Sequence, residues 1–108
     1  MLDVNFEFVG GVLFVRLEGK INNDSISSVK DNLIEIIKKG GIKYLVFNIT
    51  KSIIEERVDL FDDCNSLVKN NNGKMYICGL KNKLESVVSF KCETVKNELS
   101  VLKKIRVC

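Results

Sequence analysis

One stretch constrains the fold more than any other: a segment with helical periodicity that ends in two glycines and leads into an apolar strand. Asp24 or Ser25 is expected to cap a helix over residues 24–39, and Gly40-Gly41 to end it in the left-handed conformation. The stretch YLVFNI, residues 44–49, is almost continuously apolar, as strands buried on both faces are. A helix that runs into such a strand predicts an α/β protein with parallel strands. The inward face of the helix is predicted to be Ile26, Val29, Leu33, Ile36 and Ile37.

The chain begins with the pattern of an antiparallel hairpin. Residues 4–9 alternate with period two, so that Val4, Phe6 and Phe8 are expected on one face of a strand. Gly10-Gly11 is a hairpin-type turn, and VLFVRL over residues 12–17 predicts the second strand, closed by Gly19.

The remaining segments continue the alternation of helices and strands. A helix is predicted over about residues 57–70, with Val58, Phe61, Cys64 and Val68 inward, and a strand over residues 74–80. Residues 81–94 predict a short helix and a short edge strand. The last segment predicts a helix with Val95, Leu99 and Leu102 on one face. The predicted fold class is α/β: a small mixed sheet, with the N-terminal hairpin antiparallel and the later strands parallel, and helices packed over it.

The composition excludes several classes of function. The chain has no histidine, which removes the commonest general base and the commonest metal ligand. No C-x-x-C pair occurs, so zinc is not expected, and no sign of secretion supports a disulfide framework. We therefore predict no metal, no cofactor and no catalytic residue. Reduced cysteines are expected, at least two of them packed as small apolar residues, among Cys64, Cys78, Cys92 and Cys108.

Length and charge indicate where such a chain works. Its 108 residues fit one domain, 1–108, and it has neither a signal-peptide pattern nor an apolar run long enough for a membrane helix, so we expect the cytosol and no membrane insertion. The net charge of +3 comes from bases that are spread singly and not interleaved with aromatic residues. Nucleic acid is therefore not an expected partner.

The turn after the apolar strand is strongly acidic. It holds five acids and one base, a local charge of −4. Such a patch suits a partner protein with a basic surface. Adjacent Glu55 and Glu56 would point about 100° apart on a helix, and no nucleophile accompanies them, so the turn does not predict catalysis. The candidate partner-binding residues are Glu55, Glu56, Arg57, Asp59, Asp62 and Asp63.

Three stretches carry a resemblance to a known family. They are GVLFVRLEGKIN at residues 11–22, KYLVFNIT at residues 43–50 and NNNGKMYICGL at residues 70–80. Together with the element order, they resemble the STAS domain, the fold of bacterial anti-sigma factor antagonists. The resemblance implies a non-enzymatic regulatory domain that binds a protein such as an anti-sigma kinase. The alternative is a structural subunit of a lipid transporter of the ATP-binding-cassette class or of a signalling scaffold.

The acidic turn is where the chain departs from that family. Classical members carry a phosphorylatable Ser or Thr here, whereas residues 53–63 contain neither. Alignment places the family motif on residues 54–57 or on residues 55–58, and neither register has a hydroxyl at the acceptor position. Ser52, expected in a loop just before the turn, is the fallback phosphosite.

Three interpretations of the acids stay open. They complement the dipole of the following helix, or Glu56 (or Glu55) supplies the charge of a phosphoserine permanently, or the patch docks a partner unrelated to sigma factors. The family also places a second loop at the same end of the sheet, and the chain is expected to be a monomer or a weak dimer. That second candidate binding loop is Asn22, Asn23, Asp24 and Ser25.

Overall fold

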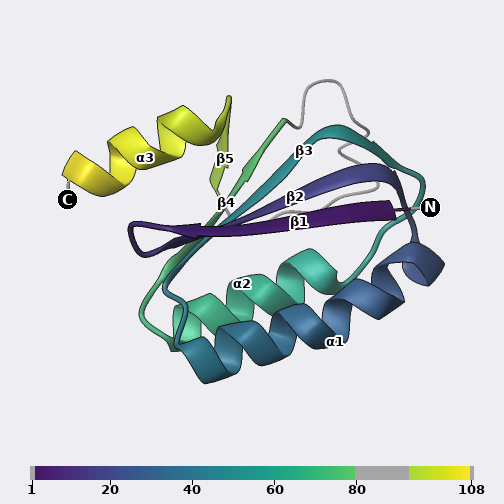
Figure 1. Ribbon diagram of the computed structural model, residues 1–108, viewed down its shortest axis with the longest axis horizontal. Helices are drawn as coiled ribbons and strands as arrows, with labels where there is room; N and C mark the ends of the chain where they lie inside the picture. The colour runs from purple at the N-terminus through teal and green to yellow at the C-terminus, as the bar shows by residue number, and fades with distance from the viewer. Residues whose placement is uncertain (1, 80–92, 108) are drawn as a thin grey trace.

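A computed structural model of the protein describes residues 2–79 and 93–107. The strands form one sheet in the order β1-β2-β3-β4-β5, with β1 antiparallel to β2 and every later pair parallel. Figure 1 shows this mixed sheet with helices on both sides, so the predicted fold class is confirmed. The elements are β1 (Leu2–Val9), β2 (Val12–Ile21), α1 (Asn23–Gly40), β3 (Tyr44–Ile54), α2 (Leu60–Asn70), β4 (Lys74–Cys78), β5 (Glu93–Val95) and α3 (Glu98–Val107).

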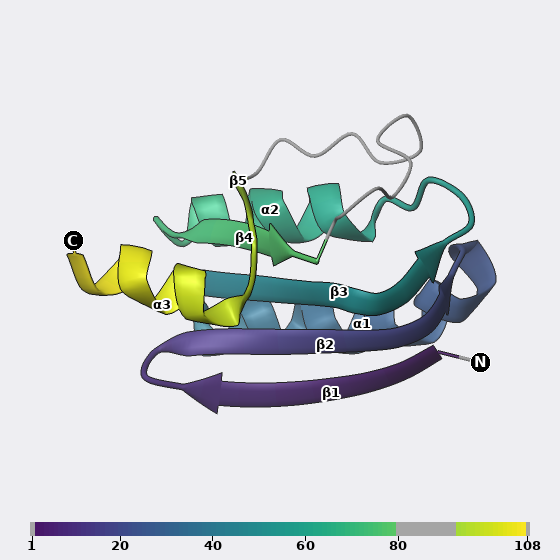
Figure 2. The same cartoon turned by 90° about the horizontal axis from the view of Figure 1, so that it is seen from above.

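The sheet has a core on each face. Helices α1 and α2 cover one face side by side, while α3 lies on the other (Figure 2). The larger core lies under α1 and α2, where the rings of Phe47 and Phe61 meet edge to face with centroids 4.9 Å apart. The smaller core lies under α3, where Val101 belongs to one buried cluster with side chains of β2, β3 and β4. Because β3 is buried on both faces, its apolar stretch is nearly continuous.

The predicted hairpin is present, but its second strand is longer than expected. Gly10 and Gly11 have φ of +58° and +83°, which suits the two-residue turn. Strand β2 does not close at Gly19 but continues to Ile21, so that prediction is wrong. Its last residues pair with the end of β3, and this pairing keeps them extended.

Helix α1 differs from the prediction in its cap and in one core residue. The N-cap is Asn22, not Asp24 or Ser25; its side chain accepts from Ser25 N while Ser25 Oγ accepts from Asn22 N, which completes a capping box. Ile36 is exposed instead of inward, because it lies on the flank of the helix beside β1. The left-handed Gly41 ends the helix as predicted.

The β3–α2 connection is shorter than the sequence suggested. Strand β3 extends to Ile54, because residues 51–54 pair with the end of β2, and α2 begins only at Leu60. The predicted start near residue 57 is therefore wrong. The turn between the two elements is residues 55–59.

The C-terminal part follows the prediction only partly. Strand β5 begins at Glu93, at the end of the segment 81–94 in which a short helix and a short edge strand were expected; the rest of that segment lies outside the described residues. In α3, the predicted apolar face is only partly confirmed: Leu102 packs against the core, but Leu99 is 59% exposed and Val95 belongs to β5. The helix begins at Glu98, which turns Val101 toward the sheet instead. Within the described residues, no helix has the length and apolar content needed to cross a membrane.

Two cysteines pack as small apolar residues, as predicted. Cys64 and Cys78 are free thiols in the two cores. Burial raises the pKa of Cys64 to about 12 and that of Cys78 to about 11, because the thiolate would lose its hydration.

We expect iodoacetamide at pH 7.5 to leave both cysteines unmodified in the folded protein and to label both in urea, as read by peptide mass mapping. Rapid labelling of either residue without denaturant would contradict their burial.

Candidate protein-binding surface

The ends of β2 and β3 bring the two predicted binding segments together. Ile21 pairs with Ile54, and the ladder continues as Glu55 N donates to Ile21 O at 3.0 Å. Just beyond, the first turns of α1 and α2 lie beside the β3–α2 turn, toward the right of Figure 1. Segments about thirty residues apart in the chain therefore share one edge of the molecule.

Two acids of the turn bind the start of α1. Asn22 Nδ2 donates to Glu55 Oε1 at 2.8 Å, and Asn23 N donates to Glu56 Oε2 at 2.8 Å. A helix leaves its first N–H groups without intrahelical acceptors, and Glu56 satisfies one of them on α1. These glutamates thus stabilise the start of α1, whereas the dipole interpretation had assigned them to the following helix.

The remaining candidates surround the start of α2. Asp59 immediately precedes the helix and makes no capping hydrogen bond with its side chain. Asp62 and Asp63 lie in the first turn, where carboxylates favour the helix dipole. Arg57 pairs with Asp62 at 3.4 Å. We call the combined set the acidic surface: Asn22, Asn23, Asp24, Ser25, Glu55, Glu56, Arg57, Asp59, Asp62 and Asp63.

Lysines from elsewhere in the chain reduce the charge of this surface. Lys30 of α1 pairs with Asp63 at 3.0 Å, and Lys20 of β2 approaches Glu55 at 3.9 Å. The hydrogen bond that Lys30 donates to the Asp63 carboxylate raises the pKa of Lys30 above its ordinary value. With Arg57, three cations accompany six carboxylates, a net charge of −3. The surface is thus negative, but it is less so than its carboxylates alone would make it.

Buried side chains fix the position of the turn, and one apolar side chain is left outside. Val58, Leu60 and Phe61 are all buried in the core under α1 and α2. Ile53, by contrast, is 63% exposed at the end of β3. Our sequence analysis missed Ile53 because it ended the strand at residue 49. Period-two alternation continued between Ser52 and Ile54 would have put Ile53 on the opposite face.

The fallback phosphosite does not lie in a loop. Ser52 is inside β3, is 5% exposed, and donates from Oγ to Leu17 O at 2.6 Å. Access to this hydroxyl would require the end of β3 to separate from β2. Thr50 is exposed, and its Oγ1 donates to Asn48 Oδ1 at 2.6 Å on the other face of the sheet.

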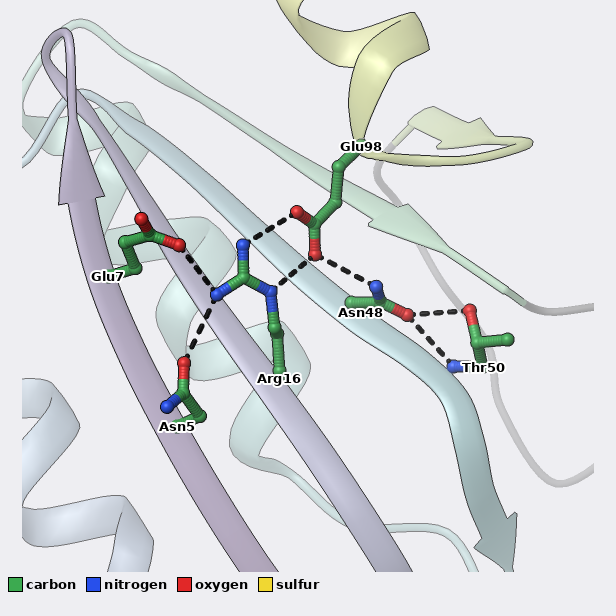
Figure 3. Close-up of polar contacts among 6 residues, drawn as sticks. All are labelled: Asn5, Glu7, Arg16, Asn48, Thr50 and Glu98. Carbon is green, nitrogen blue, oxygen red and sulfur yellow. Dashed lines mark hydrogen bonds and ion pairs between the residues drawn. The ribbon is translucent and has the colours of Figure 1, made fainter.

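A second polar cluster, drawn in Figure 3, fastens α3 to the sheet. The guanidinium of Arg16 donates twice to the Glu98 carboxylate, at 2.9 and 2.8 Å, and pairs with Glu7 at 2.7 Å. Asn48 Nδ2 also donates to Glu98, at 2.8 Å. The pKa of Glu98 is lowered, first by the hydrogen bonds from Arg16, and that of Arg16 is raised. No sequence signal could pair Arg16 with Glu98, because they are 82 residues apart.

Neither cluster has the arrangement of a metal site. Across residues 2–79 and 93–107, no three His, Cys, Asp or Glu side chains gather closely enough to hold a metal ion. The carboxylates of the acidic surface are spread over α1, the turn and α2, and most of them meet a cation or a backbone N–H group.

The mixed sheet and its helices define a family. This chain belongs to the STAS domain family, whose sequence model matches residues 3–91. The resemblance seen in three stretches of the sequence is therefore confirmed.

Solved structures with the same fold include two states of one anti-sigma factor antagonist. Unphosphorylated SpoIIAA matches with a TM-score of 0.79 at 13% identity, over 98% of this chain and 100% of that one. Phosphorylated SpoIIAA, a Bacillus cell fate determinant, matches with a TM-score of 0.77 at 14% identity, over 96% of this chain and 100% of that one. A serine-to-glutamate variant of Moorella thermoacetica RsbS matches with a TM-score of 0.74 at 19% identity, over 97% of this chain and 98% of that one. At these identities, the likeness is one of fold.

Proposed function

We propose that this chain is a non-enzymatic regulatory domain of the cytosol that binds another protein through the acidic surface, in the manner of an anti-sigma factor antagonist. The observation that carries the proposal is the pair of hydrogen bonds from Asn22 and Asn23 to Glu55 and Glu56. They join the two candidate segments into one exposed surface with a defined shape. A surface that is already ordered loses less conformational entropy when it binds.

Charge and exposure indicate the chemistry of the partner. The net charge of −3 favours a basic protein surface, whose approach it would accelerate at low salt. Exposed Ile53 lies two residues before Glu55 at the end of β3, on the other face of the sheet from Ile54, and supplies an apolar contact at the border of this surface. An apolar centre with a polar rim is the usual anatomy of a protein interface.

We also propose that binding is not switched by phosphorylation at the β3–α2 turn. SpoIIAA exists in phosphorylated and unphosphorylated forms, whereas residues 53–63 of this chain contain no hydroxyl. Glu55 and Glu56 instead keep a permanent negative charge there. One carboxylate carries less charge than a phosphate and has fewer acceptor oxygens, so it would imitate phosphoserine imperfectly. Because its charge is permanent, the chain would nevertheless stay in a single binding state.

The test of the binding surface needs variants that leave the α1 cap intact. Glu55→Lys with Glu56→Lys would remove two interactions of α1 and confuse binding with stability. Ile53→Ser and Asp59→Lys avoid this, since Ile53 is exposed and the Asp59 side chain makes no cap. We expect the double variant to melt within a few degrees of wild type and to lose most of the partner in a quantitative pulldown from native extract. Leu99→Ser is the matched control, because Leu99 is equally exposed but lies on α3.

The same pulldown separates the alternatives. Retention of the partner by the double variant would place the interface elsewhere, and a complex that does not weaken as salt rises would contradict the electrostatic part. Recovery of transporter or scaffold components would favour the structural-subunit alternative. Addition of ATP to the recovered complex should neither release the chain nor raise its mass. A phosphate mapped to Ser52 or Thr50 would overturn the unswitched state.

A further inference from the structure

Strand β1 leaves one edge of the sheet open. It is eight residues long, and no other described strand pairs with its outer side (Figure 2). Two large aromatic side chains on this strand are exposed, Phe6 at 41% and Phe8 at 60%. A long edge strand with apolar side chains is a ready template for pairing with another strand.

The hairpin turn determines which backbone groups of β1 face outward. A two-residue turn makes Val9 and Val12 the closing pair, which exchanges both of its backbone hydrogen bonds. Pairs along an antiparallel ladder alternate between bonded and non-bonded. Val4, Phe6 and Phe8 therefore direct their N–H and C=O groups away from β2, toward the open edge.

We propose that two copies of the chain associate through β1, antiparallel, about a two-fold axis that passes through Phe6. Phe6 then lies opposite Phe6 of the second copy, and Val4 opposite Phe8. These residues are the ones with outward-facing backbone groups, so the two sheets join into one. A C2 contact of this kind uses the same patch on both copies and closes on itself.

The polar face of β1 selects this register over its neighbours. In the proposed register, Asn5 lies opposite Glu7 of the second copy. The neighbouring registers that keep the outward-facing backbone groups paired differ from this one by two residues. A shift of two residues in one direction would set Asp3 opposite Glu7, and a shift in the other direction would set Glu7 opposite Glu7. Like charges directly opposite each other destabilise a sheet. The proposed register has no such pair.

The network around Arg16 prepares Asn5 for that contact. Asn5 Oδ1 accepts from Arg16 Nη1 at 3.1 Å, which leaves the Asn5 amide N–H groups to donate (Figure 3). The Glu7 carboxylate pairs with the same guanidinium at 2.7 Å. In the dimer, it could accept a hydrogen bond from the Asn5 amide of the second copy. Two Asn5–Glu7 contacts, related by the axis, would thus form with Arg16 beside each.

The opposite face of β1 offers apolar surface. Phe6 and Phe8 lie on the α1 side of the sheet, since they pair with Val15 and Leu13 of the core there. A groove between β1 and α1 is lined by Phe6 and Ile36, with polar residues at its rim. In the dimer, the Phe6 and Phe8 side chains of both copies would cover each other and this groove.

Analytical ultracentrifugation of the purified chain tests the association. We expect a monomer–dimer equilibrium that Phe6→Glu weakens about a hundredfold, since it sets two carboxylates at the axis and removes the apolar contact. Leu99→Glu, an equally drastic change on α3, should leave the dimer constant unchanged. A monomer at all concentrations, or a dimer indifferent to Phe6→Glu, would overturn the proposal. If β1 instead pairs with a different protein, the purified chain would be a monomer at all concentrations, and the proposal would be overturned.

A second, more conservative variant tests the same register in case Phe6→Glu does not fold. Asn5→Asp keeps an acceptor beside Arg16 within its own chain but opposes Glu7 in the dimer with a like charge. We expect about tenfold weaker association, restored when Glu7→Asn is added, because the pair is then complementary again. Failure of the second substitution to restore the dimer would exclude this register.

Disulfide trapping reads the register directly. In a Cys92→Ser, Cys108→Ser background, Asn5→Cys and Glu7→Cys proteins are mixed and oxidised. The facing pair would have Cα atoms about 4.5 Å apart, within disulfide range, whereas identical residues would be about 8 Å apart. Cross-linking should therefore require both proteins. Efficient cross-linking of either protein with itself would contradict the proposed axis.

Discussion

Replacing Gly73 with alanine is expected to destabilise the protein by about 3 kcal/mol or more, a large share of the roughly 5–15 kcal/mol typical of such domains. A Cβ atom at this position would lie 2.5 Å from Lys43 Cα and closer still to the Lys43 carbonyl group. The backbone cannot move aside easily, because Gly73 N donates to Val68 O and Lys74 N donates to Lys43 O, both at 2.7 Å. Urea denaturation should show a lower midpoint with little change in slope.

Gly40→Ala is the matched control for this prediction. Gly40 is the last residue of α1, and an added Cβ would meet only the Ile42 side chain, at 3.4 Å. Alanine favours a helix over glycine by up to about 1 kcal/mol, so we expect this variant to be neutral or slightly stabilised. Equal midpoints for Gly73→Ala and wild type would mean that the α2–β4 junction lies differently from the structure described above.

Glu98→Gln is expected to loosen α3 and to flatten the acid side of the stability curve. The side chain of Glu98 is only partly exposed and takes three hydrogen bonds from Arg16 and Asn48, so its loss should cost about 1–2 kcal/mol at neutral pH. Because the folded protein lowers the pKa of Glu98 below its ordinary value of 4.5, the carboxylate stabilises the fold above that pH. This contribution disappears as the pH falls through the lowered pKa.

The difference between wild type and Glu98→Gln should therefore shrink as the pH is taken from 7 toward 3. Hydrogen exchange should accelerate in α3, near Val101, before it changes in α1. Glu7→Gln is the control, since Glu7 meets the same Arg16 guanidinium but joins β1 rather than α3 to it. Unchanged α3 protection in Glu98→Gln would show that the apolar contacts of Val101 suffice to hold the helix.

Features with short-range causes could be predicted from the sequence. The hairpin follows from period-two alternation around Gly10-Gly11, and α1 from its apolar face and from Gly41 at its end. The near-continuous apolar run of β3 predicted its burial on both faces of the sheet. In each case, neighbours in the chain set the conformation, so a local pattern is enough.

Boundaries were predicted less well, for a physical reason. Strand β2 runs past Gly19, and β3 runs past residue 49, because each lengthens the other through pairing. Neither segment alone has a strand pattern that ends at the correct residue. The pairing partner, which is distant in the chain, decides where each strand stops.

The candidate surface divides in the same way. The sequence by itself determined that five acids follow β3 without a hydroxyl among them, and that a polar loop precedes α1. Only the tertiary structure decided what they do: Glu55 and Glu56 bind the start of α1, and Lys30 offsets Asp63. These contacts join residues more than thirty positions apart, and the Arg16–Glu98 link spans 82. Such pairs depend on which strands lie side by side, which no local periodicity encodes.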